Sequence, residues 1–197
     1  IKGEINEIAK KYVNENVKTI DEAIQGAKYI IAEWISDNAK YRKVIRDNTY
    51  NYGIINSKIK KNATDENKVY DMYYDYSERI KYIKPHRILA INRGENEDVL
   101  SVSIEYEKDR VINYLEKMVI KNENSIVTDI VRDAILDGYK RLIQPSIERE
   151  IRSDLTVIGE DAAINNFAKN LESLLLTPPM KERIVLAFDP GYVNGCK

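Results

Sequence analysis

The stretch TIDEAIQGAKYIIAEWI, residues 19–35, decides the fold class that the sequence predicts. Its apolar residues recur at three- and four-residue spacing, which is typical of one face of an α-helix. They are Ile20, Ala23, Ile24, Ala27, Ile30, Ile31, Trp34 and Ile35. Thr19 followed by Glu22 has the spacing of a capping box, which favours a helix start at this point. We therefore predict an amphipathic helix that buries Trp34 in the core.

The same spacing recurs along most of the chain and predicts a mostly α fold. The predicted helices cover residues 36–50, 69–83, 85–94, 125–143, 145–155 and 160–176. Asp37 or Asn38 would cap the first of these, and Gly94 would end the helix that Pro85 opens. In the last helix, Ile164, Phe167, Ala168, Leu171, Leu174 and Leu175 are predicted to face inward.

Three segments have weaker or different patterns. Residues 100–106, LSVSIEY, alternate apolar and polar side chains, which predicts a half-buried strand near residues 99–106. Residues 53–61 fit either a short strand or an extended loop. Residues 109–120 fit either a short helix or a mixture of strand and helix. The predicted fold class is therefore a multi-helix domain with a short β element.

Composition limits the classes of function. The chain of 197 residues has a formal net charge of −1, so no overall charge attracts it to nucleic acid or to a membrane surface. No apolar run approaches the roughly 20 residues that cross a bilayer, and we predict no membrane contact. Cys196 is the only cysteine, so an internal disulfide is excluded and we expect a reducing, cytoplasmic setting. Because the first residue is not Met, we expect the chain to be a piece of a longer protein.

The residues that could support chemistry form no recognisable catalytic or metal-binding pattern within residues 1–183. His86 is the only histidine and lies in the first turn of a predicted helix, where a structural role is favoured. Without a Cys/His cluster a structural zinc site is excluded. The single glycine in NRGENEDV is too few for a loop that holds phosphate. We predict no catalytic residue, no metal and no cofactor.

Two further groups of side chains were considered. The tyrosines Tyr70, Tyr73, Tyr74 and Tyr76 could stack on nucleic-acid bases, but at helical spacing a packing role is favoured. The acidic residues Glu148, Glu150 and Asp154 are predicted to lie on a solvated helix face.

Positive charge is concentrated between Lys28 and Lys61, where eight basic residues and three acidic residues leave an excess of +5. A basic patch of this kind can hold a phosphate backbone without reading its sequence. An ordinary solvated surface is the alternative. The candidate nucleic-acid-binding residues are Lys40, Arg42, Lys43, Arg46, Lys58, Lys60 and Lys61.

Five blocks of sequence, taken in order, resemble a known family. They are TIDEAIQGAKYIIAEWISDNA (19–39), PHRILAINRGENEDVLSVSI (85–104), YKRLIQPSIEREIR (139–152), AINNFAKNLESLLLTPP (163–179) and IVLAFDPGYVNGCK (184–197). Together they resemble the bacterial Tex family of transcription accessory proteins, and they cover essentially the whole chain. The resemblance implies that residues 1–183 are the central helical region of a larger protein. It also implies that this protein contains further modules that bind nucleic acid.

The last block implies a second, truncated domain. In RNase H-like folds of the YqgF type the first strand ends in an aspartate, and Asp189 in LAFDPG occupies that place. By resemblance, residues 184–197 would be this first strand. In active nucleases of the fold such an aspartate helps to hold metal. The other carboxylates of such a site would lie outside this sequence, so we expect the chain to be no enzyme.

The resemblance implies a part of a transcription accessory protein that binds RNA or DNA and positions flanking nucleic-acid-binding modules. Its partners would be nucleic acid and the transcription machinery. Two alternatives remain: part of a nuclease of the RuvC/YqgF kind, suggested by Asp189, and a scaffold that contacts only other proteins.

Overall fold

The computed structural model describes residues 4–179 and 181–188. The chain divides after Ala162 into two units, and each is described here by itself.

The first unit begins with helices whose ends are set by local hydrogen bonds. A short helix α1 (Ile5–Ala9) and a 3₁₀ turn (Lys10–Tyr12) precede α2 (Ile20–Ser36) and α3 (Ala39–Tyr52). The predicted capping box forms at the start of α2, where the Glu22 N–H donates to the Thr19 hydroxyl over 3.1 Å. Asn38 caps α3 by accepting from the N–H groups of Lys40 and Tyr41. Both helix starts that the sequence predicts are confirmed.

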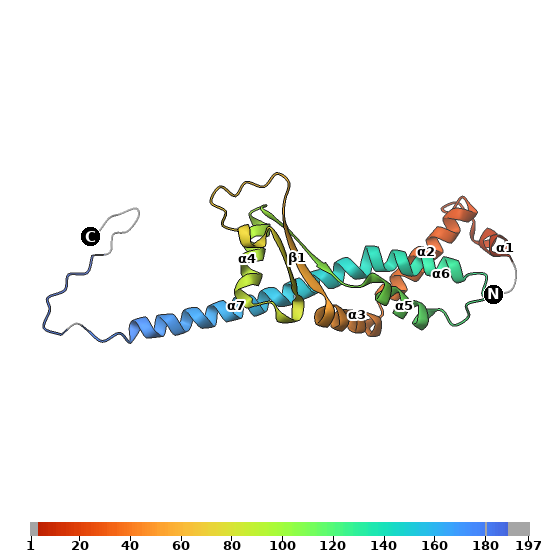
Figure 1. The fold of residues 1–197 in the computed structure, drawn as a ribbon. Coiled ribbons are helices and arrows are strands. Elements are labelled where there is room, and N and C mark those ends of the chain that lie inside the picture. Colours follow the sequence, from red (N-terminus) through yellow and green to blue (C-terminus); the bar gives the residue numbers. More distant parts are fainter. Residues whose placement is uncertain (1–3, 180, 189–197) are drawn as a thin grey trace. The chain divides into compact units, whose positions relative to one another are not determined.

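A three-stranded antiparallel sheet follows, with the order β2-β1-β3. It consists of β1 (Ile54–Ile59), β2 (Asp75–Arg79) and β3 (Leu100–Glu105), and β1 is the central strand (Figure 1). In the register, Ile55 stands opposite Glu78 of β2 and Ile104 of β3. The predicted strand at 100–106 is confirmed, and residues 53–61 form the strand that was one of two alternatives.

The helix predicted over residues 69–83 is wrong. That segment forms a 3₁₀ turn (Asp71–Tyr73), then β2, then a second 3₁₀ turn (Ile80–Tyr82). Tyrosine-rich segments have high strand propensity, and β1 offers a row of backbone groups for pairing. Hydrogen bonds to a distant strand therefore prevail over the local helical spacing.

Helix α4 (Pro85–Asn96) starts at Pro85 as predicted but extends past Gly94. Its end is a Schellman motif: the Val99 N–H donates to the Gly94 carbonyl and the Asp98 N–H to the Glu95 carbonyl. Asp98, with a φ of 59°, occupies the left-handed position that Gly94 was predicted to take. Gly94 instead lies within the helix, where a Cβ would stand 2.5 Å from Leu100 Cδ1. It is needed for close packing and not for a turn.

The chain then forms α5 (Lys108–Val119) and α6 (Thr128–Gly138), and a π-helical turn (Tyr139–Ile143) connects α6 to α7 (Gln144–Leu175). Residues 109–120 are thus helical. Pro145 lies in the first turn of α7, where the missing N–H is tolerated. The segments 145–155 and 160–176, predicted as two helices, belong to this single helix. None of the described helices is long and apolar enough to cross a membrane.

The main core of the first unit collects one or more side chains from each of its longer elements. α2 packs against α6, and the two lie side by side in Figure 1. Among the buried residues are Ile35, Ile45, Ile55, Ile91, Ile104, Leu115, Ile135, Ile143 and Ile151. A smaller cluster of Tyr70, Val99 and Leu100 joins the segment between β1 and β2 to the turn after α4 and to β3.

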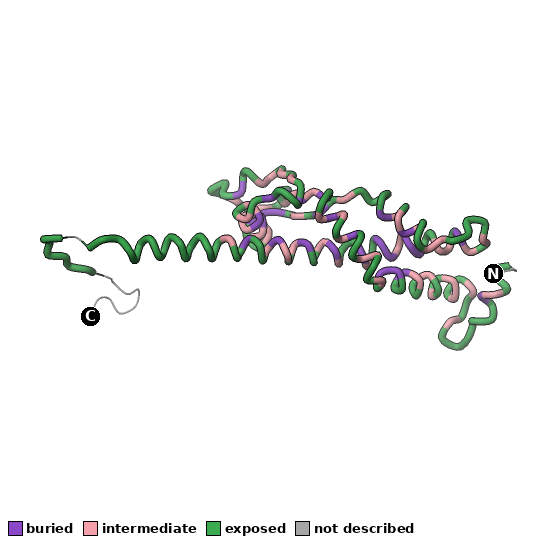
Figure 2. Tube along the Cα trace, turned by 90° about the horizontal axis from the view of Figure 1, so that it is seen from below, coloured by how far each residue is buried: buried purple, intermediate pink, exposed green. Residues whose placement is uncertain are grey.

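Two predictions about burial are wrong. Trp34 is 78% exposed, because the apolar arc of α2 is wider than the surface that neighbouring helices cover. Leu174 is 70% exposed, and Ile164, Phe167, Leu171 and Leu175 of the second unit are exposed with it. The green part of α7 in Figure 2 shows this continuous exposure. The apolar side chains recur at the predicted spacing, but no described residue of the second unit covers them.

The predicted strand of residues 184–197 is described only in part. Residues 184–188 have no regular secondary structure, and their apolar side chains are exposed. Asp189 and residues 190–197 lie outside the described residues. The assignment of this segment to an RNase H-like domain stays a prediction.

Candidate nucleic-acid interface

Four of the seven candidate residues lie together on α3. Lys40, Arg42, Lys43 and Arg46 are all within Ala39–Tyr52. The spacing of four residues brings Arg42 and Arg46 onto one face, which is turned toward α7. Lys40 and Lys43 lie on exposed positions beside that face.

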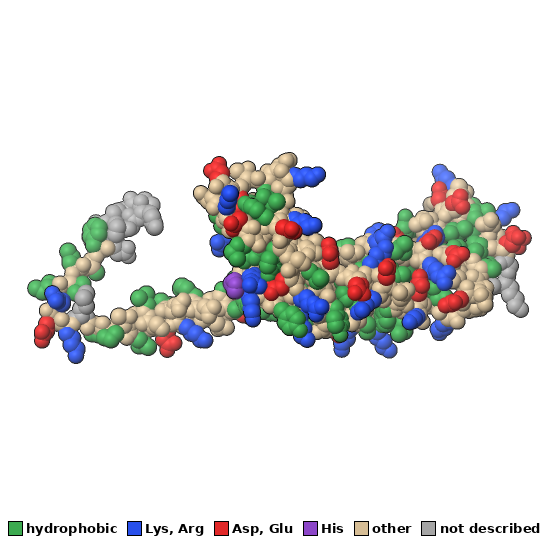
Figure 3. Space-filling view, in the orientation of Figure 1, with side chains coloured by type: hydrophobic (Ala, Val, Ile, Leu, Met, Phe, Trp, Pro, Cys, Tyr) green, Lys and Arg blue, Asp and Glu red, His purple; other side chains and the backbone are tan. Residues whose placement is uncertain are grey.

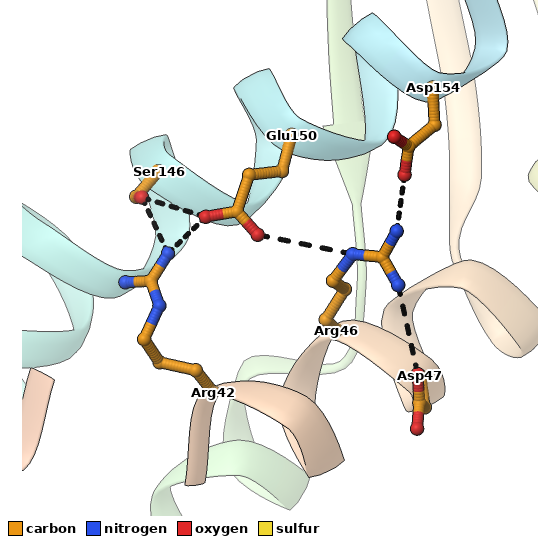
Figure 4. Close-up of polar contacts among 6 residues, drawn as sticks. All are labelled: Arg42, Arg46, Asp47, Ser146, Glu150 and Asp154. Atoms are coloured by element: carbon orange, nitrogen blue, oxygen red, sulfur yellow. Dashed lines mark hydrogen bonds and ion pairs between the residues drawn. The ribbon is translucent and has the colours of Figure 1, made fainter. Parts of the chain in front are cut away.

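The two arginines are held by α7 (Figure 4). Arg42 Nη2 donates to Ser146 Oγ over 2.8 Å and forms an ion pair with Glu150. Arg46 forms an ion pair with Asp154, and its Nε lies 3.9 Å from a carboxylate oxygen of Glu150. The contacting residues recur every four positions on both helices. This shared spacing lets residues 42 and 46 of α3 reach residues 146, 150 and 154 of α7.

This pairing corrects the prediction for the acidic residues of α7. Glu150 and Asp154 are half-exposed partners of α3 and not a free solvated face. Glu148 accepts a hydrogen bond from the backbone N–H of Ile104 over 2.9 Å and so ties α7 to β3. Arg42 and Arg46 therefore join elements of the first unit, and their charge is largely compensated within the chain.

Lys40 and Lys43 differ from the arginines. Both are exposed, and neither forms an ion pair with any residue in 4–179 or 181–188. Their charges are available to a ligand in solvent.

The remaining candidates, Lys58, Lys60 and Lys61, lie at the far end of β1. Lys58 and Lys61 are exposed, whereas Lys60 Nζ lies 2.8 Å from Asp98 Oδ1. This hydrogen bond and the charge of Lys60 lower the pKa of Asp98. β1 carries the chain roughly 20 Å beyond the end of α3 at about 3.3 Å per residue. The predicted patch is therefore divided between α3 and the far end of β1, two elements that Figure 1 labels.

The tyrosine group is part of the packing, which was the favoured alternative. The Tyr70 hydroxyl donates to Glu97 over 2.7 Å, and the Tyr74 hydroxyl donates to Asp65 over 2.9 Å. The rings of Tyr73 and Tyr76 meet edge to face with centroids 5.3 Å apart. Burial, reinforced by Glu78, raises the pKa of Tyr76 to about 12.

An apolar groove was missed by the sequence analysis. It has a volume of ≈ 560 Å³ and runs between α1, α2 and α6. Its lining includes Ile8, Ile24, Ile30, Val127 and Ile130. A second hollow of ≈ 300 Å³ contains Trp34 and shares Ile31, Val127 and Val131 with the groove. The excess width of the apolar arc on α2 was the signal for this surface.

Titratable groups in the described part of the chain do not gather into a metal site. Within 4–179 and 181–188, no three His, Cys, Asp or Glu side chains are placed to share an ion. His86 is exposed in the first turn of α4.

Comparisons with the sequences of known proteins place this chain in a family. The family model described as Tex central region-like matches residues 3–167. The uncharacterized protein YdcI of Bacillus subtilis is 52% identical over 192 residues, which cover 96% of this chain and 27% of YdcI. The transcriptional accessory protein Tex of Neisseria gonorrhoeae is 30% identical over 199 residues, covering 98% of this chain and 26% of that protein.

A human protein named S1 RNA-binding domain-containing protein 1 is 32% identical over 203 residues, covering 94% of this chain and 20% of its own length. The chain thus spans about a quarter of the length of the curated relatives that it matches. The match to the family model covers most of the chain, from α1 into the second unit. The chain belongs to the Tex central region-like family.

Proposed function

We propose that this chain is the scaffolding region of a transcription accessory protein and that its apolar groove docks another part of that protein. The observation that carries the proposal is the exposure of Trp34, at 78%, beside a groove lined almost wholly by apolar side chains. Exposed apolar surface of this extent marks interaction sites.

The occupant that fits is an amphipathic helix from the longer protein. The relatives align with nearly the whole of this chain and are about four times as long, so most of each relative lies outside the aligned region. The groove runs between helices, and a helix with apolar residues at three- and four-residue spacing would fill it. Covering Ile30 and Trp34 would remove large apolar side chains from water.

A chimaera tests the docking. The 197 residues would replace their counterpart in full-length YdcI, and Ile30→Glu with Trp34→Glu would be introduced. In the isolated chain both side chains are exposed, so the melting temperature should change little. In the chimaera the charges should enter an interface, lowering the melting temperature and increasing protease cleavage. Tyr52→Glu, at an exposed site that lines neither hollow, is the control. An unchanged chimaera would contradict the docking.

Backbone contact with nucleic acid is a second candidate function. It is favoured by the exposure of Lys40, Lys43, Lys58 and Lys61. The name of the human relative includes RNA binding, which supports nucleic acid as a partner of the longer protein. Contacts from a few lysines should be weak, independent of sequence and sensitive to salt.

Lysine variants test this contact better than arginine variants. Arg42→Glu and Arg46→Glu would place negative charges beside Glu150 and Asp154, so lost binding could reflect lost folding. Lys40→Gln with Lys43→Gln removes charge from free positions. Titration of a labelled single strand and a duplex at two salt concentrations should show weaker binding by the variant. Equal binding would remove α3 from the interface.

The proposal assigns no chemical step to this chain. The nuclease alternative depends on Asp189, which lies outside the described residues, and on carboxylates beyond Lys197. Sequencing the rest of the gene would show whether those carboxylates are present.

A further inference from the structure

A further basic surface lies where the chain passes from β2 into α4. The segment RIKYIKPHR, residues 79–87, contains four Lys or Arg residues and the only histidine. Blue side chains lie beside the purple histidine in Figure 3. In the sequence analysis only His86 of this segment was considered as a chemical group, because the segment lies outside the stretch with the +5 excess.

The alternation of buried and exposed side chains fixes the surface to the core. Ile80 and Ile83 are buried, at 1% and 8% exposure, and the Ile80 N–H donates to the Gly53 carbonyl over 3.0 Å. Their neighbours face solvent: Arg79, Lys81, Tyr82, Lys84 and His86 are exposed. A surface on an anchored backbone loses little freedom when it binds a ligand.

The positive charge of this surface is not compensated in the way that the charge of α3 is. Arg87 forms an ion pair with Glu78 of β2, with Arg87 Nη1 2.9 Å from Glu78 Oε1. Glu78 and Tyr76 together raise the pKa of Arg87. Arg79, Lys81 and Lys84 form no ion pair with any residue that the structure describes.

The packed helix α7 adds no visible compensation. It passes this turn at Gly159, where a Cβ would stand 3.4 Å from the Pro85 carbonyl oxygen. The acids that follow, Glu160 and Asp161, are exposed and make no ion pair within the described part of the chain. Arg79, Lys81 and Lys84 are therefore exposed cations without an ion-pair partner among the described residues, and a ligand can reach them.

Tyr82 gives the surface a second chemical feature. Its side chain is 59% exposed, between Lys81 and Lys84 in the sequence. Proteins hold single-stranded nucleic acid with exposed aromatic rings and nearby exposed cations, since bases stack on the rings while cations contact phosphates. Tyr82 and its exposed basic neighbours along the chain provide both kinds of group. Stacked bases in a duplex are not available to such a ring.

We propose that Arg79, Lys81, Lys84 and Tyr82 form a binding surface for single-stranded nucleic acid. The three cations contact phosphates and Tyr82 stacks on one base. This inference deepens the proposed nucleic-acid role and rests on it for the class of ligand, but it uses none of the lysines of α3 or β1. The contacts are to backbone and base face, so RNA and DNA strands are both ligands.

Salt and strand type test the surface in the 197-residue chain. Each neutralised phosphate contributes about −0.7 to the slope of log K against log salt for single strands, so three contacts predict a slope of about −2. Raising salt from 50 to 200 mM should then weaken binding of labelled oligouridine or oligothymidine about fifteenfold. The triple variant Arg79→Gln, Lys81→Gln, Lys84→Gln should lose most of this binding and most of the slope.

Tyr82→Ala separates stacking from charge. Losing one stacked base should weaken single-strand binding by about fivefold or more, while duplex binding stays the same. Circular dichroism melting of each variant checks the fold, which exposed substitutions should preserve. The inference is overturned if the triple variant binds like wild type, if the chain binds no strand at low salt, or if Tyr82→Ala weakens single strand and duplex equally.

The Lys40→Gln, Lys43→Gln variant separates this inference from the contact proposed for α3. If that variant retains binding that depends on Tyr82, the surface at residues 79–84 is supported and the role of α3 is not. If it loses all binding while the triple variant keeps it, α3 is the interface and the present inference is wrong. Neither result affects the docking of a helix in the apolar groove.

Discussion

Arg42 and Arg46 show that the role of a charged residue depends on the charge of the side chains that it contacts. In the sequence they are the centre of a basic stretch, and in the structure they meet Glu150 and Asp154 across two helices. Half-exposed ion pairs are worth little individually, so we expect each pair to add little to stability although it joins α3 to α7. The free lysines on the same helix have no such partner in the described residues.

A double-mutant cycle on Arg46→Ala and Asp154→Ala should give a coupling free energy of about 0.3–1 kcal/mol, measured by urea denaturation. The value is small because both side chains are partly exposed, at 39% and 45%. Lys43→Ala combined with Asp154→Ala is the matched control and should give no coupling. A coupling for Arg46 no larger than that of the control would show that the pair does not join the helices.

Among the elements, the junction of α4 and β3 depends on Gly94, whose packing role cannot be predicted from its position in the sequence. Gly94 is followed two residues later by the end of α4, so its spacing resembles that of a C-cap. The cap is formed instead by Asp98, and Gly94 provides the space in which Leu100 packs. The same segment therefore contains a helix end and a packing contact within seven residues.

Gly94→Ala should lower the free energy of unfolding by about 1–3 kcal/mol, because the new Cβ would overlap Leu100, which is fully buried. Helix propensity alone would predict a gain of up to about 1 kcal/mol. Gly26→Ala is the control: it lies inside α2 with nothing within 4 Å of an added Cβ, and it should stabilise. Stabilisation by both substitutions would mean that Leu100 moves aside at little cost.

For the whole molecule, the distribution of apolar surface separates the core from the docking surfaces. Ile135 of α6 is fully buried, while Trp34 of the adjacent α2 is mostly exposed. The exposed stripe on the second unit, with Phe167 and Leu174, has no cover among the described residues of that unit. Relatives about four times as long provide ample chain for covering such surfaces.

Trp34→Ala in the isolated chain should change the free energy of unfolding by no more than about 0.5 kcal/mol, because little of the side chain is buried. Ile135→Ala should cost about 2–5 kcal/mol, since it leaves a cavity in the core. Urea denaturation of the two variants makes the comparison. A loss above about 2 kcal/mol for Trp34→Ala would place that residue in the core after all.

The sequence by itself determined the features that depend on residues close together in the chain. The capping box at Thr19 and Glu22, the cap at Asn38 and the helix start at Pro85 are all hydrogen bonds or backbone constraints within four residues. The alternation in residues 100–106 also identified β3, since the strand period is independent of its partners.

Only the tertiary structure decided the features that depend on a distant neighbour. β2 forms because β1 pairs with it, although the local spacing over residues 69–83 fits a helix. Arg42 and Arg46 are compensated because α7 returns about 100 residues later with acids at matching intervals. Trp34 is exposed because α6 covers only part of the apolar arc of α2. In each case the sequence supplies the side chain, but residues far along the chain decide whether that side chain is paired, covered or left exposed.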